Sequence, residues 1–221
     1  MSYRWIASML ALTIAGGCIA EHCAAKPTGK PAKKAPHKPA AKKEAPVVSG
    51  DASTWIADPK LVVQLDQATN FGSYSLRLPV GYTIEEHDMS TDRAAITGYL
   101  AKGAPRKDNT FAVIFVVVSE AKPGFAPTDL ETILNGNPFL NGKAGIVKTD
   151  AESGTIGPLS AMRQYYKYPA QEGSTHFLHG FHYASVSGQS TIIVAAMDAG
   201  PHHAKSLPLA EAAALTLHKS E

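Results

Sequence analysis

The sequence predicts an α+β domain, built on a mainly antiparallel sheet with helices on both faces, and three observations lead to this class. Strand-like segments follow one another closely between residues 145 and 197, joined by connections too short for parallel crossovers. Helical patterns occur at separate points of the chain, near residue 130 and at the C-terminal end. Strands that are apolar on both faces need cover on both sides of the sheet.

Two strands of contrasting pattern are predicted in the first half of the domain. Tyr74, Leu76 and Leu78 alternate with polar residues, which predicts a half-buried strand over residues 72–79 that ends in a proline and glycine turn. Residues 111–118 are all apolar and rich in valine. This run predicts a central strand buried on both faces.

The remaining strands are predicted as a consecutive group in the second half of the domain. They cover residues 145–149, 159–168, 175–186 and 191–197. Dipeptides that favour turns mark the connections: Ser153-Gly154, Glu172-Gly173 and Ser187-Gly188.

Two helices are predicted outside this group. Thr128 and Glu131 have the spacing of a capping box and precede apolar residues at helical spacing, so a short helix is expected to begin here and to end near Gly136. A C-terminal helix over residues 206–218 is predicted by three apolar residues on one face: Leu209, Ala213 and Leu217.

The first 25 residues have the pattern of a signal peptide. Arg4 precedes an uncharged run over residues 5–20, shorter than the roughly 20 residues that a membrane-spanning helix needs. Two hypotheses for its processing stay open. The residues before Cys18 resemble a bacterial lipobox, in which the cysteine is lipidated, whereas cleavage near Ala20 or Ala25 would release a soluble protein. Either predicts export, to the periplasm, to an outer-membrane anchor or to the extracellular space.

Residues 26–50 form a Lys/Pro/Ala-rich segment, called the leash below, ahead of a single globular domain at residues 51–221. The leash has seven lysines and almost no large apolar side chain, so we expect it to be disordered and extended. At about 3.1 Å per residue it would span on the order of 80 Å as a spacer. The domain carries 13 basic and 17 acidic residues, so leash and domain have opposite charge.

A second hypothesis gives the leash a binding role. Lys33, Lys34, Lys42 and Lys43 would bind a polyanion, either an anionic lipid surface or an envelope polymer, through salt-dependent neutralisation. Nucleic acid is not an expected partner, because no aromatic residue lies among the lysines to stack on bases and because the chain is exported.

Histidines are the densest polar feature of the predicted domain. His176 and His182 would share one face of a strand, with His179 on the other. A zinc or copper site would require His179 to meet His202 or His203 across the fold. The alternative is a set of exposed or hydrogen-bonded histidines.

Other candidate sites have weaker patterns. Ser119 and Lys122 match the Ser-x-x-Lys spacing of some acyl-transfer enzymes, but they follow a strand and lack the companion motifs. Acidic residues that could bind calcium lack the spacing of a calcium loop, which favours a solvated acidic loop: Glu85, Glu86, Asp88 and Asp92.

Cysteines and tyrosines complete the set of candidate residues. Cys18 and Cys23 both precede residue 26, so the domain has no thiol for a disulfide, a zinc site or a nucleophile. Tyr166 and Tyr168 would share one face of a strand and Tyr165 the other. Core packing is the default role of these tyrosines, and a binding surface for a partner or a glycan is the alternative.

Three segments of the sequence resemble the PsbP-like superfamily, which includes a lumenal photosystem II protein and DcrB-type bacterial lipoproteins. They are Phe-Gly-Ser-Tyr-Ser-Leu-Arg-Leu-Pro-Val-Gly-Tyr at residues 71–82, His-Gly-Phe-His-Tyr-Ala at 179–184, and Leu-Pro-Leu-Ala-Glu-Ala-Ala-Ala-Leu-Thr-Leu-His at 207–218. The resemblance implies an α/β/α sandwich with a binding or scaffolding role. It brings no catalytic residues.

Together these patterns predict an exported or lipid-anchored, non-catalytic binding domain of the cell envelope that needs no cofactor. Its partner would be an envelope protein, an anionic polymer or a lipid surface. Contact with a membrane would come through a lipid anchor or the leash. The alternative function is a metal-binding protein or a hydrolase that uses the histidine-rich strand.

Overall fold

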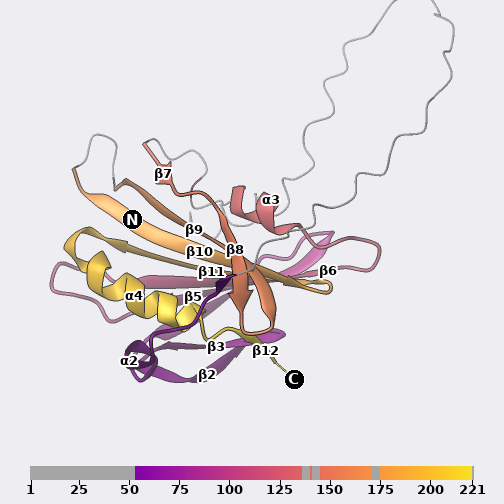
Figure 1. Ribbon diagram of the computed structural model, residues 1–221, viewed down its shortest axis with the longest axis horizontal. Helices are drawn as coiled ribbons and strands as arrows, with labels where there is room; N and C mark the ends of the chain where they lie inside the picture. Colours follow the sequence, from indigo (N-terminus) through magenta and orange to yellow (C-terminus); the bar gives the residue numbers. More distant parts are fainter. Residues whose placement is uncertain (1–52, 136–139, 141–144, 171–174, 221) are drawn as a thin grey trace, which may run out of the picture.

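The computed structural model describes residues 53–135, 140, 145–170 and 175–220. Most of this part of the chain is β-sheet (Figure 1). The predicted signal peptide and leash, with Cys18, Lys33, Lys34, Lys42 and Lys43, lie outside the described residues. Among the described residues, no helix is long and apolar enough to cross a membrane.

The larger of two sheets has the strand order β1-β8-β9-β10-β11-β6-β5-β4, with the short strand β7 beside β9. Neighbouring strands are antiparallel except β1 and β8, which run parallel. The strands are β1 (Ser53–Thr54), β4 (Thr83–Asp88), β5 (Ala94–Lys102), β6 (Val113–Ala121), β7 (Val147–Lys148), β8 (Glu152–Ile156), β9 (Leu159–Pro169), β10 (Phe177–Ser187) and β11 (Ser190–Ala199).

A small sheet and a few helices complete the domain. The small sheet has the order β12-β3-β2, from β2 (Leu65–Phe71), β3 (Tyr74–Pro79) and β12 (His218–Lys219). The helices are α2 (Pro59–Val62), α3 (Leu130–Asn135), the 3₁₀ turn η1 (Gly200–His202) and α4 (His203–Ala214). The α+β prediction therefore holds in its coarser form, as a mainly antiparallel sheet with few helices. Cover of both faces by helices stays a prediction.

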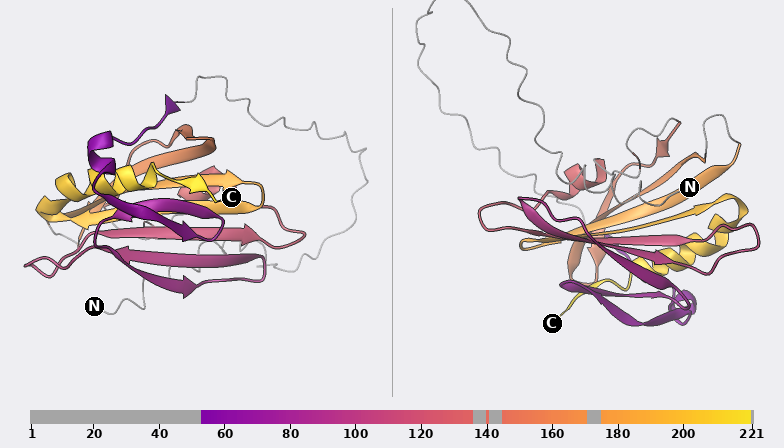
Figure 2. Two further views of the ribbon diagram at one scale, coloured as in Figure 1. Left: turned by 90° about the horizontal axis from the view of Figure 1, so that it is seen from below. Right: turned by 180° about the vertical axis from the view of Figure 1, so that it is seen from behind.

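The small sheet and α4 cover the same face of the large sheet (Figures 1 and 2). The main core lies between them and the large sheet. Phe71 and Tyr74 of the small sheet are fully buried in the same core cluster as Phe181 and Tyr183 of β10. Helix α4 meets them through small residues of its apolar face, including Ala213, so that helix and sheet approach closely. Burial of this apolar surface is the dominant stabilising term.

The two strands predicted in the first half of the domain are confirmed. β3 forms at the predicted place, but it is not half-buried, because Ser75 and Pro79 are buried along with Tyr74, Leu76 and Leu78. β6 lies between β11 and β5 with both faces buried. One turn prediction was wrong, because Gly154 lies inside β8 and pairs with Ser53. The turn follows at Gly157, whose φ of 53° suits glycine. The turn at Gly188 is confirmed.

Three further expectations need correction. Three of the four residues of the predicted acidic loop, Glu85, Glu86 and Asp88, lie in the exposed edge strand β4, where charges protect the free edge against pairing with other chains. Asp92 lies in the bend that follows. Helix α3 is capped by Asp129, whose carboxylate accepts the Thr132 N–H at 2.8 Å, one residue after the predicted cap at Thr128. Helix α4 ends at Ala214, so Leu217 packs into the core from the segment that leads to β12.

Candidate binding site

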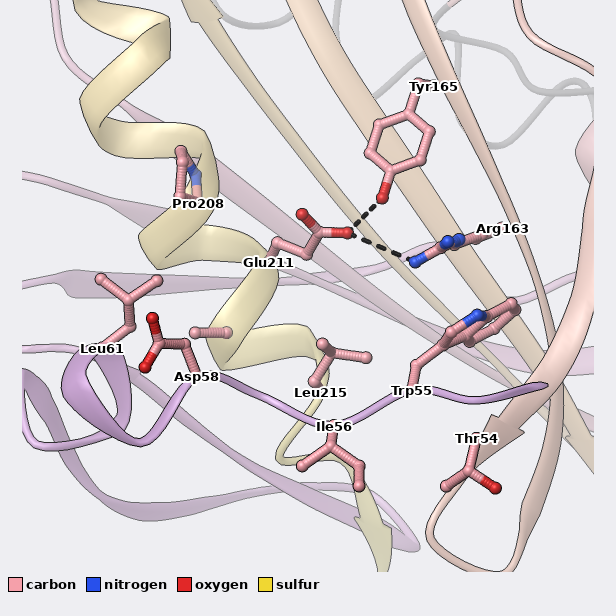
Figure 3. Close-up of a pocket in the computed structure, with 11 residues that line it drawn as sticks. Thr54, Trp55, Ile56, Asp58, Leu61, Arg163, Tyr165, Pro208, Glu211 and Leu215 are labelled. Carbon is pink, nitrogen blue, oxygen red and sulfur yellow. Dashed lines mark hydrogen bonds and ion pairs between the residues drawn. The ribbon is translucent and has the colours of Figure 1, made fainter.

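A pocket of about 430 Å³ opens where the first described residues meet β9, α2 and α4 (Figure 3). The polar and aromatic side chains that line it come from separate parts of the chain: Trp55, Asp58, Arg163, Tyr165 and Glu211. Its apolar walls are formed by residues that include Ile56, Leu61 and Leu215. The pocket is the point where segments more than 100 residues apart bring charged and aromatic groups together.

Glu211 is the central acceptor of the pocket. The phenol hydroxyls of Tyr165 and Tyr183 both donate to its Oε1 atom, Tyr183 at 2.6 Å. The sheet register explains this convergence. Arg163 and Tyr165 are two residues apart on β9, and Tyr183 of β10 lies directly opposite Arg163, so all three side chains point to the face that α4 covers.

Arg163 is held on several sides. Its Nε and Nη2 atoms donate to Oε2 of Glu152 at 2.9 and 2.8 Å, and Nη1 donates to the Tyr183 hydroxyl at 3.3 Å. Nη1 also lies 3.8 Å from Oε1 of Glu211. The guanidinium carbon sits 4.6 Å from the centre of the Trp55 ring, a cation–π contact. These contacts fix the orientation of the guanidinium.

Trp55 is positioned by the parallel pairing of β1 with β8. Its backbone N–H donates to the Thr155 carbonyl at 2.9 Å, and its ring meets that of Tyr183 edge to face at 5.5 Å. A Cβ atom on Gly154 would lie 2.6 Å from the Trp55 ring, so this strand position requires glycine. Trp55 is only 8% exposed and forms one wall of the pocket.

The surroundings of Tyr165, Tyr183 and Arg163 set their protonation states. Burial and the hydrogen bond to Glu211 raise the pKa of Tyr165 to about 12, and the same causes raise the pKa of Tyr183. Burial lowers the pKa of Arg163, but hydrogen bonds to Tyr183 and Glu152 outweigh it and raise the pKa above its usual value. Near neutral pH both phenols are therefore neutral donors and the guanidinium is charged.

The structure brings together part of the predicted metal site. The rings of His179 and His203 stack at 3.8 Å, nearly parallel, while His202 Nε2 lies 2.9 Å from Oδ2 of Asp108. Nitrogen lone pairs of stacked rings lie in parallel planes and do not converge on one ion. Among the described residues no group of three or more His, Cys, Asp or Glu side chains could hold a metal. Zinc or copper binding stays a prediction.

The predicted placement of the histidines on opposite faces of one strand is confirmed for two of the three residues. His182 is fully buried on the face opposite to His179, and burial lowers its pKa to about 4, with Lys148 contributing. Burial also lowers the pKa of His179, with smaller contributions from His203 and Lys167. His176 precedes β10, so the strand alternation does not apply to it.

The weaker candidates do not form sites. The Lys122 ammonium group donates to the Thr91 carbonyl at 2.7 Å, an arrangement that does not activate Ser119. Glu85 pairs with Lys102 at 2.6 Å on the surface of β4 and β5. Tyr166 and Tyr168 are both buried and stack on each other, whereas Tyr165 faces the pocket. The default of core packing thus holds for two of the three tyrosines.

Sequence reasoning missed Trp55, Arg163 and Glu211. Two signals were present. Arg163 shares a strand face with Tyr165, and Glu211 is the one acidic residue within α4, on a helix that is otherwise rich in alanine. A charge on a face that should pack against the core needs a partner. The spacing of residues along the sequence does not show which residue supplies that partner.

No model of a protein family matches the sequence, and no curated protein matches it. Similar solved structures include cyanobacterial PsbP (CyanoP) from Synechocystis sp. PCC 6803, with 13% identity and a TM-score of 0.48, over 80% of this chain and 97% of that one. LpqN, involved in cell envelope biogenesis of Mycobacterium tuberculosis, has 13% identity and a TM-score of 0.39, over 63% and 86%. At 13% identity the likeness concerns the fold alone.

Proposed function

We propose that this protein is an exported, non-catalytic binding domain of the cell envelope, and that its partner is recognised at the pocket of Trp55, Arg163 and Glu211. One observation carries the proposal. An open pocket holds a fixed arrangement of aromatic and charged groups whose main hydrogen bonds are made within the cluster. Preorganised groups of this kind lower the entropy cost of binding.

The chemistry of the cluster favours binding over catalysis. A nucleophile needs a neighbouring base or a lowered pKa, and a general base needs a pKa near the working pH. The two phenols have raised pKa values instead, and their hydroxyls are already committed to Glu211. The pocket can hold a ligand through hydrogen bonds, charge and apolar contact without transforming it.

Envelope location is supported by the leader and leash patterns. The leash would hold the domain away from a surface, on the order of 80 Å from an anchor at Cys18. Incorporation of a palmitate analogue into the wild-type chain, lost in Cys18→Ser, is the result expected of the anchored form. Absence of label would leave the exported, soluble form.

Photocrosslinking in intact cells tests the binding role. The full chain carries a photoreactive residue at the exposed position Ile56 on the pocket wall, with or without Glu211→Gln. We expect adducts that Glu211→Gln loses at equal protein level. Identical adducts in both chains would overturn the pocket as the binding site. Turnover of fluorogenic ester or phosphate substrates by the purified chain would overturn the non-catalytic assignment.

A metal-binding role for the histidine strand is the alternative. The observation behind it is that His179 and His203 lie side by side, so a change of their ring orientation would be needed for both to bind one ion. Isothermal titration of the full chain with zinc tests it against His203→Ala. Stoichiometric uptake that the variant loses would favour the alternative, and no uptake by either chain would remove it.

A further inference from the structure

We infer that the pocket is a binding site for a lysine ammonium group, and that its own occupant is the Lys42-Lys43 segment of this chain's leash. The inference rests on the pocket being the binding site proposed above, and it names the chemistry of the ligand. Charge, free acceptor atoms, wall composition and the path of the chain each support it.

The charge of the pocket is negative once its ion pairs are taken into account. Three charged residues line it: Asp58, Arg163 and Glu211. The guanidinium of Arg163 is already matched by Glu152, which accepts two of its N–H groups through one oxygen. The carboxylates of Glu211 and Asp58 remain. An anionic ligand would meet two like charges and an arginine whose donors are largely taken.

Each of these carboxylates keeps one oxygen outside the contacts found in the described part of the chain. Hydrogen bonds and the ion pair to Glu211 go to Oε1, and the second oxygen points away from Tyr165 and Arg163 (Figure 3). Oδ1 of Asp58 accepts the Lys60 backbone N–H at 2.9 Å as the cap of α2. The second oxygen of each carboxylate can accept from a ligand that has several N–H donors, as an ammonium group has.

The apolar walls fit the rest of a lysine side chain. Leu61 and Leu215 line the pocket beside the carboxylates, and Ile56, 80% exposed, lies at its rim. A lysine places four methylene groups behind a point charge, so its stem can cover such surface while its head reaches the carboxylates. A small inorganic cation would leave the walls unused.

The path of the chain identifies the occupant. The described residues begin at Ser53, and Thr54 already lines the pocket. Nine residues separate Ser53 from Lys43, and they include Gly50, which favours a turn. A short linker of about this length holds its end at a roughly millimolar effective concentration. A lysine site of millimolar affinity would then be about half occupied without an external ligand.

This arrangement couples the two binding functions of the chain. A polyanion that took up the leash lysines would withdraw Lys42 and Lys43 from the pocket and open it to an external ligand that carries an ammonium group. Conversely, such a ligand would release the leash. By linkage, the two binding events would strengthen each other by the same factor.

Nuclear magnetic resonance of the indole N–H of Trp55 tests the inference. The processed chain retains Trp55 alone once Trp5 leaves with the leader. Lys42→Gln/Lys43→Gln removes two charges near the pocket, and Lys33→Gln/Lys34→Gln is the matched control, with the same charge change farther along the leash. We expect the first pair to shift the indole resonance, and the control pair to leave it within a quarter of that shift.

A probe then separates the pocket from its occupant. Added Nα-acetyl-lysine amide should bind the Lys42→Gln/Lys43→Gln chain with a dissociation constant of roughly 1 mM, and Glu211→Gln should weaken it about tenfold. Asp58→Asn, which keeps the helix cap, should weaken binding of the probe about threefold. This second variant keeps the test valid if Glu211→Gln misfolds. Nα,Nε-diacetyl-lysine amide, without the charge, should not bind.

Each outcome decides a separate claim. If the probe binds but the Lys42→Gln/Lys43→Gln chain matches the control pair, the leash is not the occupant. If the indole shift depends on protein concentration, the occupant is the leash of a second copy, which also overturns the claim. If the probe shifts no resonance in any chain, the ammonium site is wrong. The proposed function would then still be judged by the Glu211→Gln crosslinking result, which does not depend on lysine.

Discussion

Two arginine–carboxylate clusters lie against α4, and they differ in what their carboxylates leave free. At the start of the helix, Arg106 donates to both oxygens of Asp198 at 2.8 and 2.6 Å, and Ser206 and the Ala199 N–H also donate to them. This set is called the Asp198 cluster. Farther along the helix, Arg163 faces Glu211, whose described contacts all go to one oxygen.

The two carboxylates also differ in burial, and the one with all its contacts made is the more buried. The side chain of Asp198 is 0% exposed, and that of Glu211 is 27% exposed. Burial raises the pKa of Asp198, but the hydrogen bonds from Arg106 and Ser206 outweigh it and lower the pKa below its ordinary value. A closed, fully bonded pair ties a loop to a helix, whereas an open pair keeps an acceptor for a ligand. The same residue types therefore form a closed structural pair in one place, and in the other they leave the open carboxylate that the proposed binding site uses.

Removing the arginines should give the largest difference between the clusters. Arg106→Met leaves a buried carboxylate without its partner, so we expect a loss of about 3 to 5 kcal/mol in the free energy of unfolding. Arg163→Met leaves carboxylates that water can reach, and we expect a loss of about 1 to 2 kcal/mol. Urea unfolding followed by circular dichroism measures both. Equal losses would contradict the comparison.

Acid titration supplies a reference away from both clusters. The pKa of His182 is lowered in the folded state, so the unfolded chain binds more protons and stability is lost as pH falls from about 6.5 to 4. The expected loss is about 3 kcal/mol in the wild type. In His182→Gln most of this loss should disappear and only the smaller part from His179 should remain, as measured by urea unfolding at a series of pH values. A loss unchanged in the variant would assign it to other groups.

Moving Trp55 should affect the pocket more than the rest of the fold. In Gly154→Ala the new Cβ would lie 2.5 Å from the Ser53 carbonyl oxygen and 2.6 Å from the indole, so β1 and Trp55 must shift. We expect a loss of about 1 to 3 kcal/mol together with loss of the Glu211-dependent crosslinks. The neighbouring change Ser153→Ala is the control and should leave both unaffected. Retention of the crosslinks in Gly154→Ala would show that Trp55 is not needed for binding.

The smallest expected change in stability sharpens the comparison most. Glu211→Gln keeps an oxygen that accepts from Tyr165 and Tyr183, so thermal unfolding should report a loss of no more than about 1 kcal/mol. Binding should nevertheless be weakened, because an uncharged NH2 donor takes the place of the free carboxylate oxygen. Asp198→Asn should give the reverse result, with a large loss of stability and a pocket that still binds in the folded molecules.

Much of the fold could be predicted because local patterns specify it. The apolar run of β6 and the split of Tyr165 from Tyr166 both depend on which face a side chain occupies. Errors arose where a local signal had two meanings. Gly154 resembled a turn residue but gives room for Trp55, and the acidic residues of β4 resembled a loop because an edge strand is charged.

By itself the sequence determined the leader pattern, the basic leash, the absence of thiols after residue 25 and the order of most strands. The tertiary structure alone decided the pocket and the separation of the histidines. Strand period places Arg163 and Tyr165 on one face, but it does not say which distant segment covers that face. That depends on long-range packing, which brings Trp55 and Glu211 together across more than 150 residues of chain.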